Sequence, residues 1–143
     1  MSGRIVAAFA GALFAAVCCA WAQETPAPPA AAADEVVGQD LYGRHCLTCH
    51  QADGYGVPNM QPAITGGTWV GGDPRALAMF VMTGGFDSAS RKESDNANVM
   101  PAFAQLSDAE LAAILTFVRA KFGKGASAVS EAEVGETRKS LPK

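Results

Sequence analysis

The five residues Cys46-Leu47-Thr48-Cys49-His50 constrain this chain more than any other feature of its sequence. A C-x-x-C-H run has the spacing of a site at which haem is attached covalently. Two cysteines three positions apart can each form a thioether with one vinyl group of the same haem. The adjacent His50 can then ligate the iron from one face, so a chain folded around such a group is expected to transfer electrons.

The first 22 residues have the pattern of a secretory signal peptide. Arg4 precedes an apolar run over residues 5–20, and Ala20-Trp21-Ala22 supplies the small residues of a cleavage site. The apolar run is short for a membrane span, and an uncleaved anchor is the alternative. We expect cleavage after Ala22 and export of the remaining chain.

Removal of this leader simplifies both the cysteine count and the charge. Cys18 and Cys19 go with it, so Cys46 and Cys49 are the only cysteines left and no disulfide framework is expected. The loss of Arg4 leaves ten Lys and Arg against 14 Asp and Glu, a net charge of −4. No basic stripe is present, which argues against nucleic acid as a partner.

Three other uses of the cysteine–histidine motif fit the chain poorly. Structural zinc takes about four ligands, and the exported chain offers only Cys46, Cys49, His50 and His45, of which His45 and Cys46 are adjacent. A thioredoxin-like redox pair is expected near a βαβ pattern, which this sequence lacks. A plain disulfide would leave His50 without a role, so haem attachment is the favoured interpretation.

The chain reads as one all-α domain at residues 34–123. A Pro/Ala-rich linker at residues 23–33 precedes the domain, and a polar, flexible tail at residues 124–143 follows it. We expect the first helix to begin with Asp34 as its cap and to end near Cys46. Its packed side is predicted to consist of Val36, Val37, Gly38, Leu41 and Tyr42.

The middle of the domain is predicted to contain a loop and one short helix. Residues 51–72 are rich in glycine and proline and read as loop. Asp73 is a natural N-cap and Pro74 suits the first helical position. Gly84-Gly85 should end this helix, and residues 86–99 form a long polar connection.

The last helix of the domain carries the strongest local signal. Ser107 and Glu110 form a capping box, in which each side chain satisfies a backbone donor beside the other residue. Apolar residues then recur at helical spacing until Gly123, which should end the helix.

Four methionines could supply the second axial ligand of a haem iron. Met79 and Met82 lie three residues apart on a predicted helix, where methionines usually fill the core. Met60 is only ten residues beyond the motif. Met100 precedes Pro101, which holds it extended, and enough chain separates it from His50 to pass around the cofactor. Met100 is therefore preferred, and the other three remain alternatives.

With these landmarks the chain resembles the class I bacterial cytochromes c, the mitochondrial-cytochrome-like class, over residues 34–123. The matching features occur in order: the Gly38/Tyr42 helix, the Cys46–His50 motif, Pro62-Ala63-Ile64, the Met100-Pro101 loop and the capped terminal helix. The resemblance implies an all-α cytochrome c fold, with three or more helices and Gly/Pro-rich loops around one haem c. It also implies that the first and last helices cross nearly perpendicular to each other, with Gly38 and Tyr42 against Ile114 and Phe117.

The resemblance also assigns roles to residues around the haem. The Pro62 carbonyl would accept a hydrogen bond from the His50 ring and fix its orientation. Trp69 would pack at the haem edge or meet a propionate, with plain core packing as an equal alternative. Arg75 is a weaker candidate for a propionate partner. Attachment of haem c in this family implies a periplasmic location.

These expectations lead to a function. A His/Met pair raises the reduction potential of haem and fills both iron faces, so the chain is predicted to be a one-electron carrier and not an enzyme. Met100-Pro101-Ala102-Phe103 is similar to segments in cytochrome subunits of periplasmic dehydrogenases. That similarity implies a dehydrogenase as donor and an oxidase or another cytochrome of a respiratory chain as acceptor, without stable membrane insertion. The alternative is a haem enzyme, or a gas- or peroxide-binding protein, with an open sixth iron position.

Overall fold

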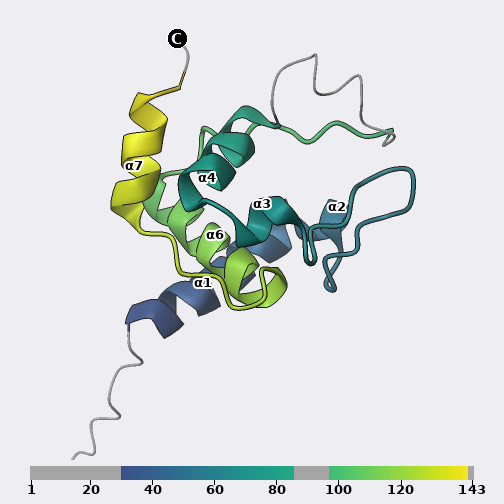
Figure 1. Cartoon of the computed structure of the whole chain (residues 1–143), viewed down its shortest axis with the longest axis horizontal. Coiled ribbons are helices and arrows are strands. Elements are labelled where there is room, and N and C mark those ends of the chain that lie inside the picture. The colour runs from purple at the N-terminus through teal and green to yellow at the C-terminus, as the bar shows by residue number, and fades with distance from the viewer. Residues whose placement is uncertain (1–29, 86–96, 142–143) are drawn as a thin grey trace, which may run out of the picture.

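The computed structural model of the protein describes residues 30–85 and 97–141. Within these two ranges the regular structure consists of six helices, and the only extended pairing is an isolated bridge between Val57 and Gln61. The prediction of an all-α fold is confirmed (Figure 1). In chain order the helices are α1 (Ala30–His45), α2 (Leu47–His50), α3 (Thr68–Gly71), α4 (Pro74–Thr83), α6 (Asp108–Phe122) and α7 (Glu131–Lys139).

Helices α1 and α6 cross at close range, and their contact forms the centre of the core (Figure 1). A methyl group on Gly38 would overlap the Ala113 carbonyl and would lie 2.9 Å from the Cβ of Phe117. One turn later, the ring centroid of Tyr42 is 5.4 Å from that of Phe117. The expected contact of Gly38 and Tyr42 with the terminal helix of the domain is therefore confirmed for Phe117.

The start of α1 differs from the sequence prediction. The helix begins at Ala30, so Asp34 lies inside it and is not its cap, and the last four residues of the predicted linker are helical. A run of alanines favours this extension because alanine has the highest helix propensity. Val36 and Val37 are 70% and 52% exposed, so the prediction that they pack was wrong. The amino-terminal end of α1 projects from the body of the molecule (Figure 1).

The caps of α4 and α6 confirm the local signals in the sequence. Asp73 accepts a hydrogen bond from the Arg75 amide at 3.0 Å, and Gly84 ends α4 in the left-handed region at φ 74°. The Ser107 amide donates to Glu110 at 2.8 Å, and the Glu110 amide donates to the Ser107 hydroxyl at 3.2 Å. These pairs satisfy amides that the first turn of a helix leaves without partners.

Two short helices were not predicted. Residues 51–72 were expected to be loop throughout, but α3 occupies Thr68–Gly71 and α2 lies just before that segment, at Leu47–His50. Each is a single turn of four residues, too short to show an apolar period in the sequence.

The tail after residue 123 also departs from the prediction. It was expected to be flexible, yet it contains α7, which packs against α4 and α6. Ser130 and Glu133 form a capping box, and Val134 is fully buried. A helix of nine residues is marginal in isolation, so α7 depends on this packing, which the sequence pattern does not display.

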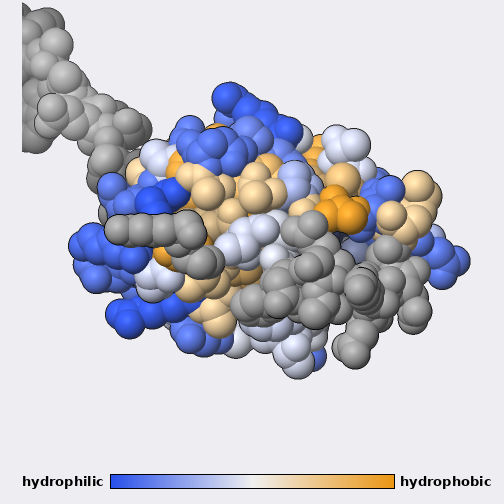
Figure 2. Space-filling model, turned by 90° about the horizontal axis from the view of Figure 1, so that it is seen from above, coloured by the Kyte–Doolittle hydropathy of each residue, from blue (hydrophilic) through white to orange (hydrophobic). Residues whose placement is uncertain are grey.

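Several predicted segments lie outside the described residues. They are the leader at residues 1–22, most of the linker and residues 86–96 of the polar connection. None of the described helices is both long and apolar enough to cross a membrane. On the face seen from above, hydrophilic residues form much of the outline and apolar residues gather toward the middle (Figure 2).

The crossing at Gly38 generates the first prediction. Gly38→Ala should lower the free energy of unfolding by about 1–3 kcal/mol, because its methyl group must displace the α6 backbone. Gly43→Ala is the matched control on the same helix, since nothing lies within 4 Å of its added methyl group. Its effect should be neutral or stabilising by up to about 1 kcal/mol. Urea unfolding measures both, and equal stability of the two variants would contradict the close crossing.

Candidate functional site

A single cavity of about 460 Å³ collects the residues that the sequence marked as functional. Its volume falls in the range of roughly 300–1,000 Å³ that is usual for ligand pockets. The predicted site residues that line it are Cys46, Cys49, His50, Pro62, Trp69 and Met100. Residues more than fifty positions apart in the chain thus face one space.

The end of α1 and the single turn of α2 place the two cysteines and the histidine. The Cys46 amide donates to the Tyr42 carbonyl at 2.9 Å, which continues the hydrogen bonding of α1. The amides of Cys49 and His50 both donate to the Cys46 carbonyl, at 3.1 and 2.9 Å. One tight turn therefore sets both thiols and the imidazole on the same wall of the cavity.

The Cys46 thiol is held uncharged by its surroundings. Burial, and secondarily the neighbouring Cys49 thiol, raises the pKa of Cys46 to about 11. A thiol with such a pKa stays protonated near neutral pH, because apolar surroundings disfavour the charged thiolate.

The imidazole of His50 is kept neutral by the same apolar surroundings. Burial lowers the pKa of His50, and the nearby Pro62 carbonyl acts in the opposite direction. The Nδ1 atom of His50 is buried and makes no hydrogen bond of normal geometry. A neutral imidazole is the form that ligates metals, and an adjacent carbonyl acceptor is the usual partner of the nitrogen that does not ligate.

A glycine allows the loop carrying Pro62 to fold back against His50. Gly56 has φ 66°, and its amide donates to the His50 carbonyl at 3.2 Å. A methyl group on Gly56 would lie 2.7 Å from the Pro62 carbonyl oxygen. Both the positive φ and the lack of space require glycine here.

Met100 is fixed from its amino-terminal side by the loop that follows the motif. The Ala97 amide donates to the Asn59 carbonyl at 2.9 Å, and the Asn98 amide donates to the Met60 carbonyl at 3.1 Å. Met100 itself is partly buried against the core.

Beyond Met100, the chain is fixed against the end of α4. The Phe103 amide donates to the Val81 carbonyl at 3.2 Å. Gly84 lies so close that a methyl group on it would be 2.7 Å from the Met100 carbonyl oxygen and 2.8 Å from the Ala102 nitrogen. The Met100 segment is thus held on both sides.

The other candidate methionines do not border the cavity. Met60 is 45% exposed and Met82 is buried at 1% in the core, and neither lines the space beside His50. Met79 lines a second, more open cavity between α4 and α7. Of the four candidates, all within the described residues, Met100 alone faces the same cavity as His50.

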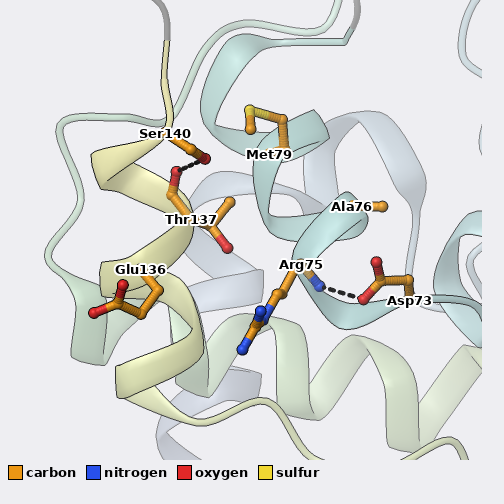
Figure 3. A pocket seen from close by; sticks show the side chains of 7 residues that line it. All are labelled: Asp73, Arg75, Ala76, Met79, Glu136, Thr137 and Ser140. Carbon is orange, nitrogen blue, oxygen red and sulfur yellow. Dashed lines mark hydrogen bonds between the residues drawn. The ribbon is translucent and has the colours of Figure 1, made fainter.

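That second cavity also contains Arg75, which points from α4 toward α7 (Figure 3). It does not border the cavity of Cys46 and His50, so the structure gives no support to Arg75 as a propionate partner. The full lining of the second cavity, about 490 Å³ in volume, is Asp73, Arg75, Ala76, Met79, Glu136, Thr137 and Ser140.

Trp69 borders the main cavity while packing on a neighbour. Its ring stacks on Phe80 with centroids 5.2 Å apart and an interplanar angle of 29°. The side chain is 43% exposed. Trp69 therefore forms an edge of the cavity, and its packing against haem stays a prediction.

Sequence reasoning did not assign the apolar lining to the cavity, and it missed one polar group. Gln61 lines the cavity, and its Oε1 atom is buried without a hydrogen-bond partner; no signal in the sequence marks it. The helical period predicts that α4 and α6 each have an apolar face but not that these faces border the cavity, as they do at Leu77, Phe80, Val81, Ile114, Leu115 and Val118.

This arrangement fits a haem. The cavity is lined mainly by apolar side chains, as a porphyrin requires, and two thiols and a neutral imidazole share one wall. A methionine thioether comes from a different segment of the same cavity. These are the donor types that hold haem in c-type cytochromes.

Comparison with known proteins identifies the class. The family model for cytochrome c matches residues 36–121, which is more than half of the 143-residue chain. The chain belongs to the cytochrome c family, whose cofactor is haem c and whose members transfer electrons. The predicted family and fold are confirmed.

Individual relatives are cytochrome subunits of dehydrogenases. The chain is 33% identical over 113 residues to the gluconate 2-dehydrogenase cytochrome c subunit of Pantoea cypripedii, covering 74% of this chain and 25% of that one. It is 35% identical over 104 residues to the cytochrome c subunit of the quinone alcohol dehydrogenase of Gluconobacter oxydans, covering 71% and 22%. The chain thus spans about a quarter of the length of these relatives.

The position of Gly84 generates a second prediction. Gly84→Ala should loosen the Met100 segment and make the Phe103 amide exchange hydrogen about tenfold faster, because its methyl group collides with that backbone. Gly85→Ala carries the same left-handed strain at φ 87°, but its nearest neighbour is a Phe80 ring carbon at 3.6 Å. Exchange measured by mass spectrometry should rise only in the first variant. An equal rise of the Phe103 exchange rate in both variants would contradict this prediction. It would show that left-handed backbone strain, and not the collision with the Met100 segment, loosens the chain there.

Proposed function

We propose that this protein is a periplasmic one-electron carrier with a single haem c. Cys46 and Cys49 hold it by thioethers, and His50 and Met100 are the axial iron ligands. The observation that carries the proposal is the convergence of these four side chains on one apolar cavity. When bound, haem supplies an iron that alternates between ferric and ferrous states; the chain supplies attachment, orientation and shielding.

Cys46 and Cys49 would supply the two thiols for attachment. Each thiol would add across one vinyl group, with the sulfur bonding to one carbon and the hydrogen of the thiol passing to the other. No oxidant is consumed. A 3.1 Å backbone hydrogen bond closes the turn from Cys46 to Cys49, so both cysteines of the attachment motif lie in one turn.

The axial residues set the electronic properties. His50 would offer a neutral imidazole, and the nearby Pro62 carbonyl would orient it. Met100 offers a soft thioether, which raises the reduction potential relative to harder ligands. With both positions filled by protein side chains, no site is left for oxygen or peroxide, in keeping with electron transfer.

The partners follow from the relatives and from the surface near the motif. Since its relatives are cytochrome subunits of gluconate and alcohol dehydrogenases, we assign a dehydrogenase as donor and an oxidase or another cytochrome as acceptor. Leu47, between the two cysteines, is 39% exposed and would contribute to a small, transient docking patch there. The leader-like residues 1–22 support a periplasmic location.

The role of Met100 is tested by removing its sulfur. Met100→Ala should abolish the weak red-edge absorption band of the ferric protein and let the ferrous protein bind carbon monoxide. The reduction potential should fall on the order of 0.1 V, within the range of about 0.8 V over which axial ligands set haem potentials. Met60→Ala is the control because that side chain is exposed and lies off the cavity.

A wild-type ferric protein without the band, or an unchanged band in Met100→Ala, would contradict His/Met ligation. The first result would favour the alternative of an open sixth position, with ligand-binding or catalytic chemistry.

The covalent link is tested by mass. Wild-type protein exported by a host with haem-attachment machinery should keep the mass of one haem after denaturation. The single variants Cys46→Ala and Cys49→Ala should keep it through the remaining thioether, in lower yield, and the double variant should lose it. Retention of haem mass by the denatured double variant would contradict thioether attachment at these residues.

A further inference from the structure

The C-terminal helix α7 contacts the segment that connects Met100 to α6. Its Arg138 guanidinium donates from Nε to Asp108 Oδ1 at 2.7 Å, from Nη2 to the Leu106 carbonyl at 2.7 Å, and from Nη1 to the Ala104 carbonyl. One side chain thus bonds to three positions within five residues, the first of them four residues after Met100.

We propose that Arg138 is a positioning residue for Met100: α7 serves as a brace that keeps the Met100 sulfur on the iron. The inference rests on the proposed function, since it takes Met100 as an axial ligand. It goes beyond that function because it assigns a task to a helix outside residues 36–121, the range of the family match.

The braced segment is short and leads directly to the ligand. Phe103 and Leu106 are buried, and the Leu106 amide donates to the Phe103 carbonyl at 3.1 Å. Phe103 in turn is bonded to the Val81 carbonyl on α4. Arg138 therefore holds the carboxyl-terminal half of a connection whose other half is held by α4.

The helix α7 is itself firmly seated, as a brace requires. Val134 is fully buried and Thr137 is 5% exposed. A methyl group on Gly135 would lie 2.9 Å from Asp108 Oδ2, so the two helices approach closely beside the Arg138 contact. Asp108 stands in the first turn of α6, where a carboxylate is favoured by the helix dipole.

The Arg138–Asp108 pair is better shielded from solvent than an ordinary surface ion pair. The side chains of Arg138 and Asp108 are 28% and 31% exposed, whereas those of the neighbouring Lys139–Glu136 pair are 74% and 62% exposed. Exposed single pairs contribute little. A planar guanidinium bonded to one carboxylate and two carbonyls is stronger and more directional.

The experiment compares Arg138→Gln with Lys139→Gln in the full haem-loaded protein. Both variants remove one positive charge from adjacent positions of α7, but only Arg138 touches the Met100 connection. The probe is cyanide, which binds ferric iron only after the methionine sulfur has left. Uptake is followed at a temperature where far-UV circular dichroism shows full helix content in every variant.

We expect cyanide uptake roughly tenfold faster in Arg138→Gln than in wild type, from the loss of charge-assisted bonds, and an unchanged rate in Lys139→Gln. Arg138→Lys is the second test variant and is used if Arg138→Gln folds poorly. It keeps the charge but lacks the forked donors, and it should also be several-fold faster than wild type.

Two results would overturn the proposal in different ways. A wild-type rate in Arg138→Lys, or equal rates in Arg138→Gln and Lys139→Gln, would overturn the brace while leaving Met100 as ligand. Absence of the red-edge ferric band in wild type would overturn the brace together with the Met100 ligand.

Discussion

The close crossing of α1 and α6 at Gly38 is the contact on which the haem site depends. Helix α1 ends at His45, directly before the first cysteine of the motif, and α6 lines the same cavity through Ile114 and Val118. Because no side chain separates the helices at Gly38, their packing fixes where Cys46 lies relative to these α6 side chains. The cavity is thus defined by packing within the core before any cofactor is bound.

The sequence predicted those parts of the fold that are determined by local chemistry. The capping box of Ser107 and Glu110 predicted the start of α6 because both partners lie within one turn. The same box occurs at Ser130 and Glu133, yet α7 was not predicted, since the nine residues of this helix are mostly polar. Its stability comes from burial of residues such as Val134 against other helices, and tertiary contacts of this kind leave no period in a short segment.

For the site, too, local features were predictable from the sequence and tertiary contacts were not. Cys46 and His50 were predictable because their chemistry lies in one contiguous motif, and Met100 was preferred because the proline after it prevents a helix. The features that hold Met100 in place were not predictable, since they come from distant backbone, as at Gly84, and from Arg138. They show that the Met100 segment is held by contacts from distant parts of the described chain.

The central claim is that one iron is held between an imidazole from the motif and a thioether from a distant segment. X-ray absorption at the iron K-edge of the ferrous wild-type protein tests it most directly, because it counts the atoms bound to the metal. The account predicts five nitrogens, four from the porphyrin and one from His50, and a single sulfur from Met100. A coordination shell of light atoms alone, without sulfur, would contradict it.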